Sequence, residues 1–241
     1  MKTVAWFSGG VSSAVAIKIC EQQIDQIIYT HIDDQHPDTL RFVKDCETWF
    51  GLPIKIMQHQ YKDVETACLK KMFIRTPSGA ECTTVLKRRV RKQWEREQTE
   101  PLIYVWGLDC EEKKRADRLR KNMFEQKHVF PLIESGICKS LAHQLLRKSG
   151  IKRPMMYDLG YLNNNCIGCV KGGMGYWNKI RVDFPDVFEK RAKMERIIGA
   201  SCINGCYLDE LDPERGRSTP PIVEACGIMC ELMMLEKEVR G

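Results

Sequence analysis

Short apolar runs alternate with longer amphipathic segments along roughly the first half of the chain. The apolar runs predict strands at Thr3–Phe7, Gln26–Ile32, Pro53–Met57, Leu102–Trp106 and Val129–Ile133. The amphipathic segments between them predict helices at Ser12–Glu21, Pro37–Phe50, Asp63–Phe73, Val85–Glu97 and Glu111–Phe124. Strands that alternate with helices are typical of a doubly wound, mostly parallel sheet, so we expect an α/β fold.

Beyond Ser140 this alternation stops. Residues 1–150 are therefore predicted to form the sheet domain, and residues 151–241 a cysteine-containing, largely helical cap packed on it. The features beyond Ser140 are a helix, a segment rich in Asn, Gly and Cys, a second helix and an apolar helix-like stretch, at Leu141–Ser149, Leu162–Gly175, Phe184–Ile198 and Ile222–Val239.

The segment Ser-Gly-Gly-Val-Ser-Ser at residues 8–13 follows the first predicted strand and precedes the first predicted helix. Gly9 and Gly10 allow a tight turn with exposed backbone N–H groups, and the helix directs the positive end of its dipole at the loop. Ser8, Ser12 and Ser13 add neutral hydroxyl donors, while the lysine of a Walker loop is missing. This order predicts a phosphate-binding loop; the alternative is a glycine-rich turn with a serine N-cap.

Two further segments follow predicted strands. Asp33 and Asp34 come after the second strand, and Gly107–Glu112 comes after the fourth. Because parallel sheets bind their ligands beyond the carboxyl ends of the strands, we expect these segments and the loop at residues 8–13 to contribute to a ligand site.

The composition, with 43% hydrophobic and 29% charged residues among 241, is that of an ordinary globular protein. No apolar run approaches the ~20 residues that a membrane span needs, and the beginning of the chain does not resemble a signal peptide, so we expect no membrane association. Twelve cysteines in such a chain indicate a reducing, cytoplasmic environment. The net charge of +6 owes much to Lys87–Arg96 and Lys113–Lys121, which predict either an anionic partner or solvated helix faces.

The spacing of the cysteines predicts a second kind of site. Cys166-x-x-Cys169 lies in a turn-rich segment flanked by glycines and has the spacing of metal ligands. Further pairs are Cys202-x-x-x-Cys206 and Cys226-x-x-x-Cys230, and Cys82 is single. The other cysteines lie in helices or apolar surroundings and are predicted to be buried structural thiols: Cys20, Cys46, Cys68, Cys110 and Cys138.

Five motifs in order from residue 3 to about 198 carry a family resemblance. They are Ser-Gly-Gly-Val-Ser-Ser at residues 8–13, Ile32-Asp33-Asp34 with Pro37-Asp38-Thr39, Cys82 with Leu86-Lys87, Gly107 with Glu112 and Arg115, and Asn165-Cys166-Ile167-Gly168-Cys169. Together they resemble the phosphoadenosine-phosphosulfate reductase family of the adenine-nucleotide alpha-hydrolase (PP-loop) superfamily. Two positions depart from the pattern, because Ser12 stands where the ATP pyrophosphatases carry Asp, and Asp109 stands where the family carries its first Arg.

The resemblance implies that the loop at residues 8–13 holds the phosphates, or the phosphosulfate, of ATP or phosphoadenylyl sulfate. Asp33 and Asp34 would meet the ribose or adenine, or serve as helix N-caps, and Glu112 would orient an arginine or bind Mg²⁺. Lys87, Arg88 and Arg115 would counter the phosphate charge. The expected nucleotide-binding residues are Ser8, Gly9, Gly10, Ser12, Ser13, Asp33, Asp34, Gly107 and Glu112, and the expected catalytic residues are Ser8, Ser13, Lys87 and Arg115.

Three arrangements of the cysteines remain open. In the first, Cys82, Cys166 and Cys169 hold a [4Fe–4S] cluster with one open iron, which in similar sulfur-insertion enzymes carries the incoming sulfur. In the second, Cys166, Cys169, Cys226 and Cys230 close a four-thiolate site for zinc or a cluster. In the third, they are reduced loop thiols. We favour a cluster that involves Cys166 and Cys169.

The segment Glu224-Ala225-Cys226-Gly227 is similar to the Glu-Cys-Gly-His-like tail of the reductases, whose thiolate attacks the sulfonyl sulfur. An alanine intervenes, Met229 stands where a histidine is expected, and the neighbours Glu224 and Glu231 supply no positive charge. We therefore expect Cys226 to be a ligand or a packing residue rather than the nucleophile.

The segment from Gly172 to Arg181 places two aromatic and two cationic residues after the cysteine pair. It could stack on a base and hold a phosphate of a nucleic acid, or open an amphipathic helix with aromatic residues in the core. Its partners under the first interpretation would be nucleic acids.

Three functions are consistent with these features. The first hypothesis is an ATP-dependent sulfurtransferase that adenylylates an acceptor, releases pyrophosphate and inserts sulfur from a sulfur-donor protein. The second is a reductase that makes sulfite from adenylyl or phosphoadenylyl sulfate with a thioredoxin-like partner. The third is a non-catalytic nucleotide- or nucleic-acid-binding partner in a larger assembly.

Overall fold

The computed structural model describes residues 1–76 and 79–216, which form two compact units. The first unit comprises Met1–His31, Pro37–Met57 and Lys92–Asp158, and the second comprises Ile32–His36, Gln58–Arg91 and the residues from Leu159 onward. The chain therefore passes between the units several times, whereas the sequence predicts one division at residue 150.

The first unit is built on a parallel sheet with strand order β3-β2-β1-β6-β7. Its strands are β1 (Lys2–Phe7), β2 (Gln26–Thr30), β3 (Ile54–Met57), β6 (Leu102–Val105) and β7 (Lys127–Val129). The chain moves outward from β1 through β2 to β3, and then returns to pair β6 with the other side of β1. The strand order thus reverses between β1 and β6, and this reversal confirms the predicted doubly wound α/β fold.

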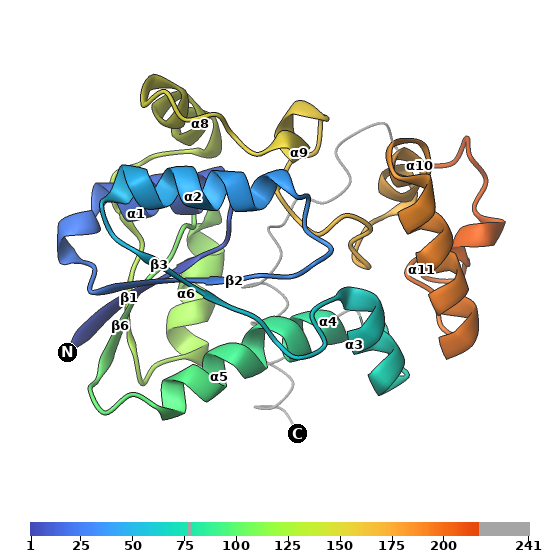
Figure 1. The fold of residues 1–241 in the computed structure, drawn as a ribbon, viewed down its shortest axis with the longest axis horizontal. Helices are drawn as coiled ribbons and strands as arrows, with labels where there is room; N and C mark the ends of the chain where they lie inside the picture. The colour runs from blue at the N-terminus through green and yellow to red at the C-terminus, as the bar shows by residue number, and fades with distance from the viewer. Residues whose placement is uncertain (77–78, 217–241) are drawn as a thin grey trace. The chain divides into compact units, whose positions relative to one another are not determined.

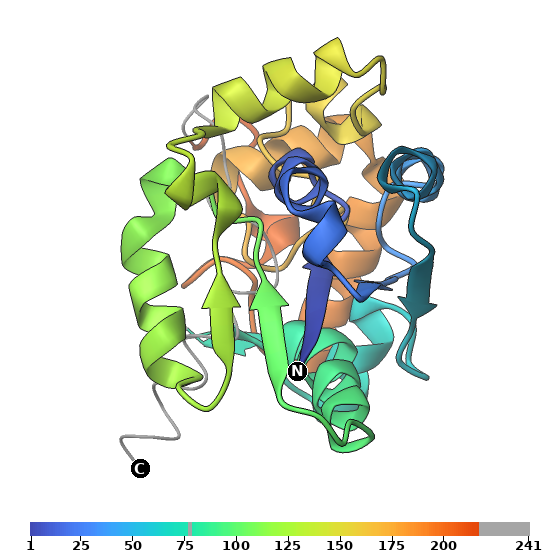
Figure 2. The same cartoon turned by 90° about the vertical axis from the view of Figure 1, so that its left-hand side faces the viewer.

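Helices cover both faces of this sheet. Figures 1 and 2 show α1, α2 and α8 on one face and α5 and α6 on the other. The helices of this unit are α1 (Val11–Ile19), η1 (Glu21–Gln23), α2 (Asp38–Phe50), η3 (Cys110–Glu112), α6 (Lys113–Asn122), α7 (Pro131–Glu134), α8 (Lys139–Lys148) and α9 (Met155–Asp158), and α5 (Arg89–Arg96) lies mostly within it.

Strand β1 contributes side chains to the apolar cores on both faces of the sheet, because alternate side chains of a strand point to opposite sides. Ala5 and Phe7 join the apolar cluster of α1, α2 and α8. Trp6 points to the other face and meets Trp94 of α5 edge-on, with ring centroids 5.7 Å apart. The buried apolar run at residues 3–7 is therefore explained by cover on both faces.

The strand expected at Val129–Ile133 is wrong in its second half. The strand β7 ends at Val129, and helix α7 begins at Pro131. Proline suits the first position of a helix, because it needs no N–H partner there. The Glu134 carboxylate accepts a hydrogen bond from the Phe130 amide at 3.1 Å, which stabilises the start of α7. The apolar run at these residues resembles a strand and does not indicate this helix.

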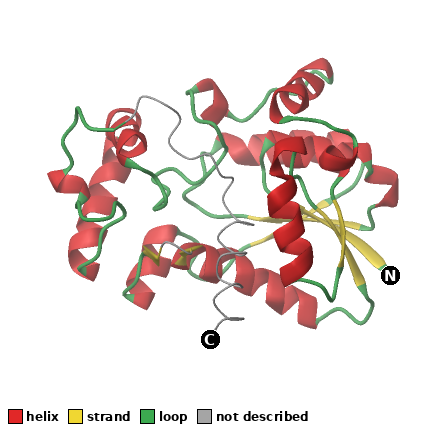
Figure 3. Cartoon of the chain, turned by 180° about the vertical axis from the view of Figure 1, so that it is seen from behind, coloured by secondary structure: helices red, strands yellow, loops and turns green. Residues whose placement is uncertain are grey.

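The second unit is mainly helical. It contains α3 (Val64–Lys71), the hairpin strands β4 (Arg75–Thr76) and β5 (Gly79–Ala80), α4 (Glu81–Thr83), η2 (Thr84–Arg88), α10 (Met174–Asp183), α11 (Pro185–Ile198) and η4 (Leu208–Glu210). In Figure 3 the loop before α10 is drawn in green and the short hairpin in yellow. Helix α11 packs against α3, α10 and η4. In the described part of the chain, no helix has the length and apolar character needed to cross a membrane.

Candidate functional site

The serine loop (residues 8–13) connects β1 to α1 in the first unit. Gly9 has a φ of 75°, the left-handed conformation that glycine adopts without strain. The Ser8 and Ser13 hydroxyls lie 2.7 Å apart, and the Ser13 hydroxyl donates to the Gly10 carbonyl at 2.9 Å. The Ser8 amide donates to the Ser13 Oγ at 3.3 Å. Ser8 and Ser13 therefore brace the turn itself.

Ser12 differs from these two serines. It is half-buried at the start of α1, and among the described residues its hydroxyl and its backbone amide donate no hydrogen bond to another group. The first amides of a helix have no partner within the helix and carry its positive partial charge. Ser12 therefore supplies the donors of this loop that an anion could use.

Tyr157 lies beside the N-terminus of α1, although no sequence motif includes it. Its hydroxyl accepts a hydrogen bond from the Val11 amide at 3.3 Å. The segment before it is fixed by α2, because the Met155 amide donates to Asp38 at 2.8 Å and Arg41 donates to the carbonyls of Lys152 and Arg153. Tyr157 thus forms one wall of the serine loop from 146 residues away.

Gly107 brings the end of β6 against the serine loop. A Cβ atom at this position would lie 2.4 Å from the Ser13 Cα, so only glycine allows this approach. The next turn is a capping box, in which Asp109 accepts from the Glu111 amide and Glu112 accepts from the Asp109 amide. The structure therefore brings two of the three predicted strand-end segments together.

Arg115 is buried on α6 and forms an ion pair with Glu112. Both carboxylate oxygens of Glu112 are engaged in this way, one by Arg115 and one by the Asp109 amide. Lys139 at the start of α8 lies near Asp109 and Arg115, and burial lowers its pKa. The turn after β6 thus carries two partly buried cations on the unit that holds the serine loop.

Asp34 lies in the second unit, where it forms an ion pair with the buried Arg191 of α11. Its other carboxylate oxygen accepts from the Val64 amide at 2.6 Å, at the N-terminus of α3. Asp33 is exposed and accepts from the Gln58 side chain at 2.5 Å. In this structure both carboxylates are engaged by protein groups, and the N-cap of α3 is Asp63.

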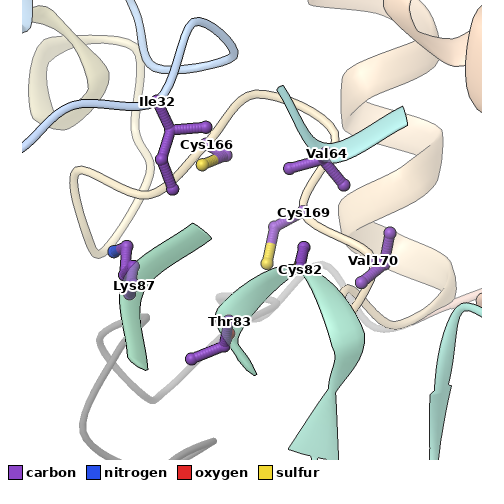
Figure 4. Close-up of a pocket in the computed structure, with 8 residues that line it drawn as sticks. All are labelled: Ile32, Val64, Cys82, Thr83, Lys87, Cys166, Cys169 and Val170. Atoms are coloured by element: carbon purple, nitrogen blue, oxygen red, sulfur yellow. The ribbon is translucent and has the colours of Figure 1, made fainter. Parts of the chain in front are cut away.

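The second unit also contains a small pocket, the thiol pocket. Figure 4 shows its lining: Ile32, Val64, Cys82, Thr83, Lys87, Cys166, Cys169 and Val170. Three predicted ligand cysteines and the predicted catalytic Lys87 therefore surround one cavity. Cysteines 84 residues apart in the chain, such as Cys82 and Cys166, meet here because α4 and the loop before α10 line the same space.

Tyr176 holds the Cys166–Cys169 turn in place. Its hydroxyl accepts from the Cys169 amide at 2.8 Å and donates to the Cys166 carbonyl at 3.3 Å. Burial raises the pKa of Tyr176 well above its usual value, so it stays a phenol. Tyr176 and Trp177 are both buried, which corrects the interpretation of this segment as a platform for stacked bases and confirms that these aromatic residues belong to the core.

Arg191 holds the same turn from the other side. Its Nε donates to the Gly168 carbonyl at 3.3 Å while its guanidinium pairs with Asp34. Asp34 in turn accepts from the Ile167 amide through its own carbonyl at 2.8 Å. Gly168 has a φ of 67°, and a Cβ atom there would lie 2.6 Å from Val187. The cysteine turn is therefore rigidly positioned by buried polar groups.

Lys87 lies in a π-helical turn, Thr84–Arg88. Such turns are rare, and they occur frequently at functional sites because they displace side chains from the regular helical positions. Arg88 in the same turn is buried. A lysine ammonium beside thiols favours their thiolate form, which is the nucleophile.

The expected metal group is an iron–sulfur cluster or zinc held by cysteines. The chemistry of three thiols among apolar side chains suits a soft metal or an iron–sulfur cluster. Within residues 1–76 and 79–216, however, no three His, Cys, Asp or Glu side chains are grouped closely enough to hold a metal ion. Cys226 and Cys230, the other expected ligands, lie outside the described residues.

The remaining cysteines divide into two kinds. Cys20, Cys46 and Cys68 are buried, as predicted, and burial raises the pKa of each thiol. Cys110 and Cys138 are a correction, because both are only half-buried and their sulfurs lie next to each other. Cys138 precedes α8, whose first turn lies at the surface. The apolar neighbours of Cys138 in the sequence do not indicate this exposure.

The chain matches a known protein family. The family described as the phosphoadenosine phosphosulfate reductase domain matches residues 2–172. This span includes every strand of the large sheet, the serine loop and the Cys166–Cys169 turn. A search of curated proteins finds no match.

Proposed function

The chain belongs to the phosphoadenosine phosphosulfate reductase domain family, and from this premise we propose that it is an ATP-dependent sulfurtransferase. The family consists of adenine-nucleotide-binding enzymes of sulfur metabolism. Its members include reductases and sulfurtransferases, so the reaction depends on the residues of this chain. The observation that carries the proposal is the thiol pocket, in which three cysteines and Lys87 surround one cavity.

In the first half-reaction the serine loop holds the phosphates of ATP. The Ser12 amide and the Ser12 hydroxyl donate to phosphate oxygens, while Ser8 and Ser13 keep the turn in shape. An acceptor oxygen attacks the α-phosphorus, the bond to the β-phosphate oxygen breaks, and pyrophosphate leaves. Arg115, oriented by Glu112, neutralises charge on the leaving group, and Mg²⁺ binds the phosphates.

In the second half-reaction the cysteines handle the sulfur. A persulfide on one cysteine of the Cys166–Cys169 turn attacks the activated carbon, and AMP leaves with the former acceptor oxygen. The acceptor is then joined to that cysteine through a disulfide. The second thiolate of the turn attacks this disulfide, which releases the thiolated acceptor and leaves a disulfide between the two cysteines. Lys87 favours the thiolate forms, and an external dithiol of the thioredoxin kind restores the thiols.

The alternative to a cysteine persulfide is a [4Fe–4S] cluster, which Cys82, Cys166 and Cys169 would hold and whose open iron would carry the transferred sulfur, as the resemblance implies. Zinc would require further ligands, for which Cys226 and Cys230 are the candidates. Anaerobic purification followed by iron, sulfide and zinc analysis of the wild-type chain and of Cys169→Ser tests this part. Iron that is lost in Cys169→Ser supports the cluster, and zinc without iron contradicts it.

The proposed partners follow from the same chemistry. The basic residues of α5 and α6 favour a nucleic-acid acceptor, and a sulfur-donor protein must supply the persulfide. Reduced thiols and an external dithiol favour a reducing compartment such as the cytoplasm.

The test uses bulk tRNA and duplex DNA as acceptors, ATP, and ³⁵S-labelled polysulfide, which transfers zero-valent sulfur to a thiolate, as donor. We expect ATP-dependent incorporation of label with release of pyrophosphate. Cys169→Ser should abolish it, while Cys206→Ser, a half-buried thiol outside the pocket, should retain it. Sulfite release from phosphoadenylyl sulfate with a reduced thioredoxin, in place of these products, would establish the reductase.

A further inference from the structure

Cys110 and Cys138 form a pair of neighbouring thiols in the first unit, whereas the thiol pocket belongs to the second. The Cys110 sulfur donates a hydrogen bond to the Cys138 sulfur at a distance of 2.8 Å. This distance is well inside ordinary contact between two sulfur atoms, and a disulfide bond of ~2.05 Å needs an approach of only ~0.8 Å. Both residues are half-buried, so a small reagent can reach them.

The backbones on both sides of the pair are fixed. The Cys110 amide donates to the Ile137 carbonyl at 3.0 Å, which ties the two segments together directly beside the thiols. On one side the capping box of Asp109 and Glu112 holds η3. On the other side the Ile137 amide donates to the Leu132 carbonyl at 2.7 Å. The close approach of the sulfurs is therefore a property of the fold.

Nothing in the proposed sulfur transfer uses this pair. The buried thiols serve as apolar side chains, as Cys20 does when it donates to the Ala16 carbonyl of its own helix. Cys110 and Cys138 instead come from different elements, the turn after β6 and the residue before α8, and are accessible. The hydrogen bond to Cys138 raises the pKa of Cys110 to about 11.

We propose that Cys110 and Cys138 are a reversible dithiol–disulfide site that exchanges with soluble disulfides of the glutathione class. The thiolate of one cysteine attacks the disulfide RSSR, forms a mixed disulfide and releases RS⁻. The other cysteine then attacks the mixed disulfide and releases the second RS⁻. The two protein thiols lose two electrons and two protons, and one RSSR becomes two RSH. This site does not depend on the proposed function.

The sequence allows the pair to be measured without interference from the other cysteines. Trypsin cleavage after Arg96, Lys113, Lys127 and Lys139 places the two cysteines on the peptides 97–113 and 128–139, and neither contains another cysteine. The folded full-length protein is equilibrated in glutathione buffers of graded oxidation, blocked with N-ethylmaleimide in acid, digested and analysed by mass spectrometry.

We expect the linked 97–113/128–139 peptide to rise to a majority of the protein in one two-electron transition and to disappear on return to reduced glutathione. Cys110→Ser and Cys138→Ser should each stop at a stable mixed disulfide with glutathione on the remaining cysteine. Cys206→Ser should give the wild-type midpoint. Absence of the linked peptide from folded wild-type protein in fully oxidised glutathione would overturn the proposal, and this measurement needs no variant. Glutathione adducts on both cysteines of the wild type would also overturn it.

Discussion

The serine loop and the Cys166–Cys169 turn are both small turns held by hydrogen bonds, but they differ in where their partners lie along the chain. Ser8 and Ser13 brace the serine loop across five residues. The cysteine turn depends on Tyr176, seven residues from Cys169, and on Arg191, whose own partner Asp34 is 157 residues away. A local turn is encoded in its own motif, whereas a turn braced from a distance exists only when the whole unit is folded.

The largest expected effect is at Arg191. Arg191→Met removes a buried guanidinium and leaves the half-buried Asp34 carboxylate without its cation, which should lower the free energy of unfolding by about 3–5 kcal/mol. The double variant Arg191→Met with Asp34→Asn should lose less than the single one, because no charge remains uncompensated. Chemical denaturation measures both, with Lys193→Ala on the exposed face of α11 as a control that should stay within about 0.5 kcal/mol. Equal losses in the single variant and the control would show that the turn does not depend on Arg191.

The second effect concerns the serine loop. Gly107→Ala would place a Cβ atom 2.4 Å from the Ser13 Cα, and both groups belong to backbones that cannot rotate away. Overpacking of this kind should cost about 1–3 kcal/mol of stability and weaken nucleotide binding.

The matched control is Gly173→Ala, because a Cβ atom at Gly173 meets nothing within 4 Å. Denaturation and titration with ATP provide the two measurements. A Gly107→Ala protein with unchanged stability and affinity would contradict the close approach of β6 to the loop.

The third effect is a dependence of stability on pH. His143 packs edge-on against Tyr157, and burial lowers the pKa of His143 from 6.5 to about 4. Between these values the unfolded chain binds a proton that the folded chain does not. Stability should therefore fall as the pH drops from about 6.5 to about 4, by roughly 1–2 kcal/mol for a half-exposed group.

Denaturation at several pH values measures this slope, and His143→Gln should remove the part that His143 contributes. If His143→Gln keeps the full wild-type slope between pH 4 and pH 6.5, another group is responsible.

The smallest expected effects distinguish Ser12 from Ser13 in the serine loop. Ser13→Ala removes an internal brace and should cost about 1 kcal/mol of stability. Ser12→Ala should leave stability within about 0.5 kcal/mol and weaken ATP binding about five- to tenfold, the loss of one hydrogen bond to a charged group. Calorimetric titration with ATP and denaturation of both variants compare the two. If Ser12→Ala and Ser13→Ala change stability and ATP affinity equally, then the assignment of Ser13 to bracing the loop and of Ser12 to binding ATP is wrong.

This contrast also explains what the sequence could predict. The sheet, its order of strands and helices, and the serine loop follow from local patterns, and β1, β2 and α2 begin or end within two residues of their predicted positions. The Cys166-x-x-Cys169 spacing identified the turn, and Cys82 was selected with it. Tyr157, Tyr176 and Arg191 were missed as site residues, because their importance comes from contacts with residues that are distant in sequence.

Two features have the same physical origin. Asp34 is predicted to meet a nucleotide because it follows a strand, and in this structure its carboxylate pairs with Arg191, which comes from a helix near the end of the described chain. Cys110 and Cys138 were expected to be buried because of their apolar neighbours, but exposure depends on which elements cover them. Local hydrophobicity predicts helices and strands well, but it does not predict which polar groups form contacts with each other.

The ion pair between Asp34 and Arg191 also has a consequence for synthesis of the protein. The ribosome adds about 5–20 residues per second, so the codons between these two residues take roughly 10–30 s to translate. Most of that interval passes before Cys166 and Cys169 are made, and the turn that they form cannot take its final shape until Arg191 follows them. The nascent cysteines are therefore accessible to oxidants and metal ions before the fold encloses them.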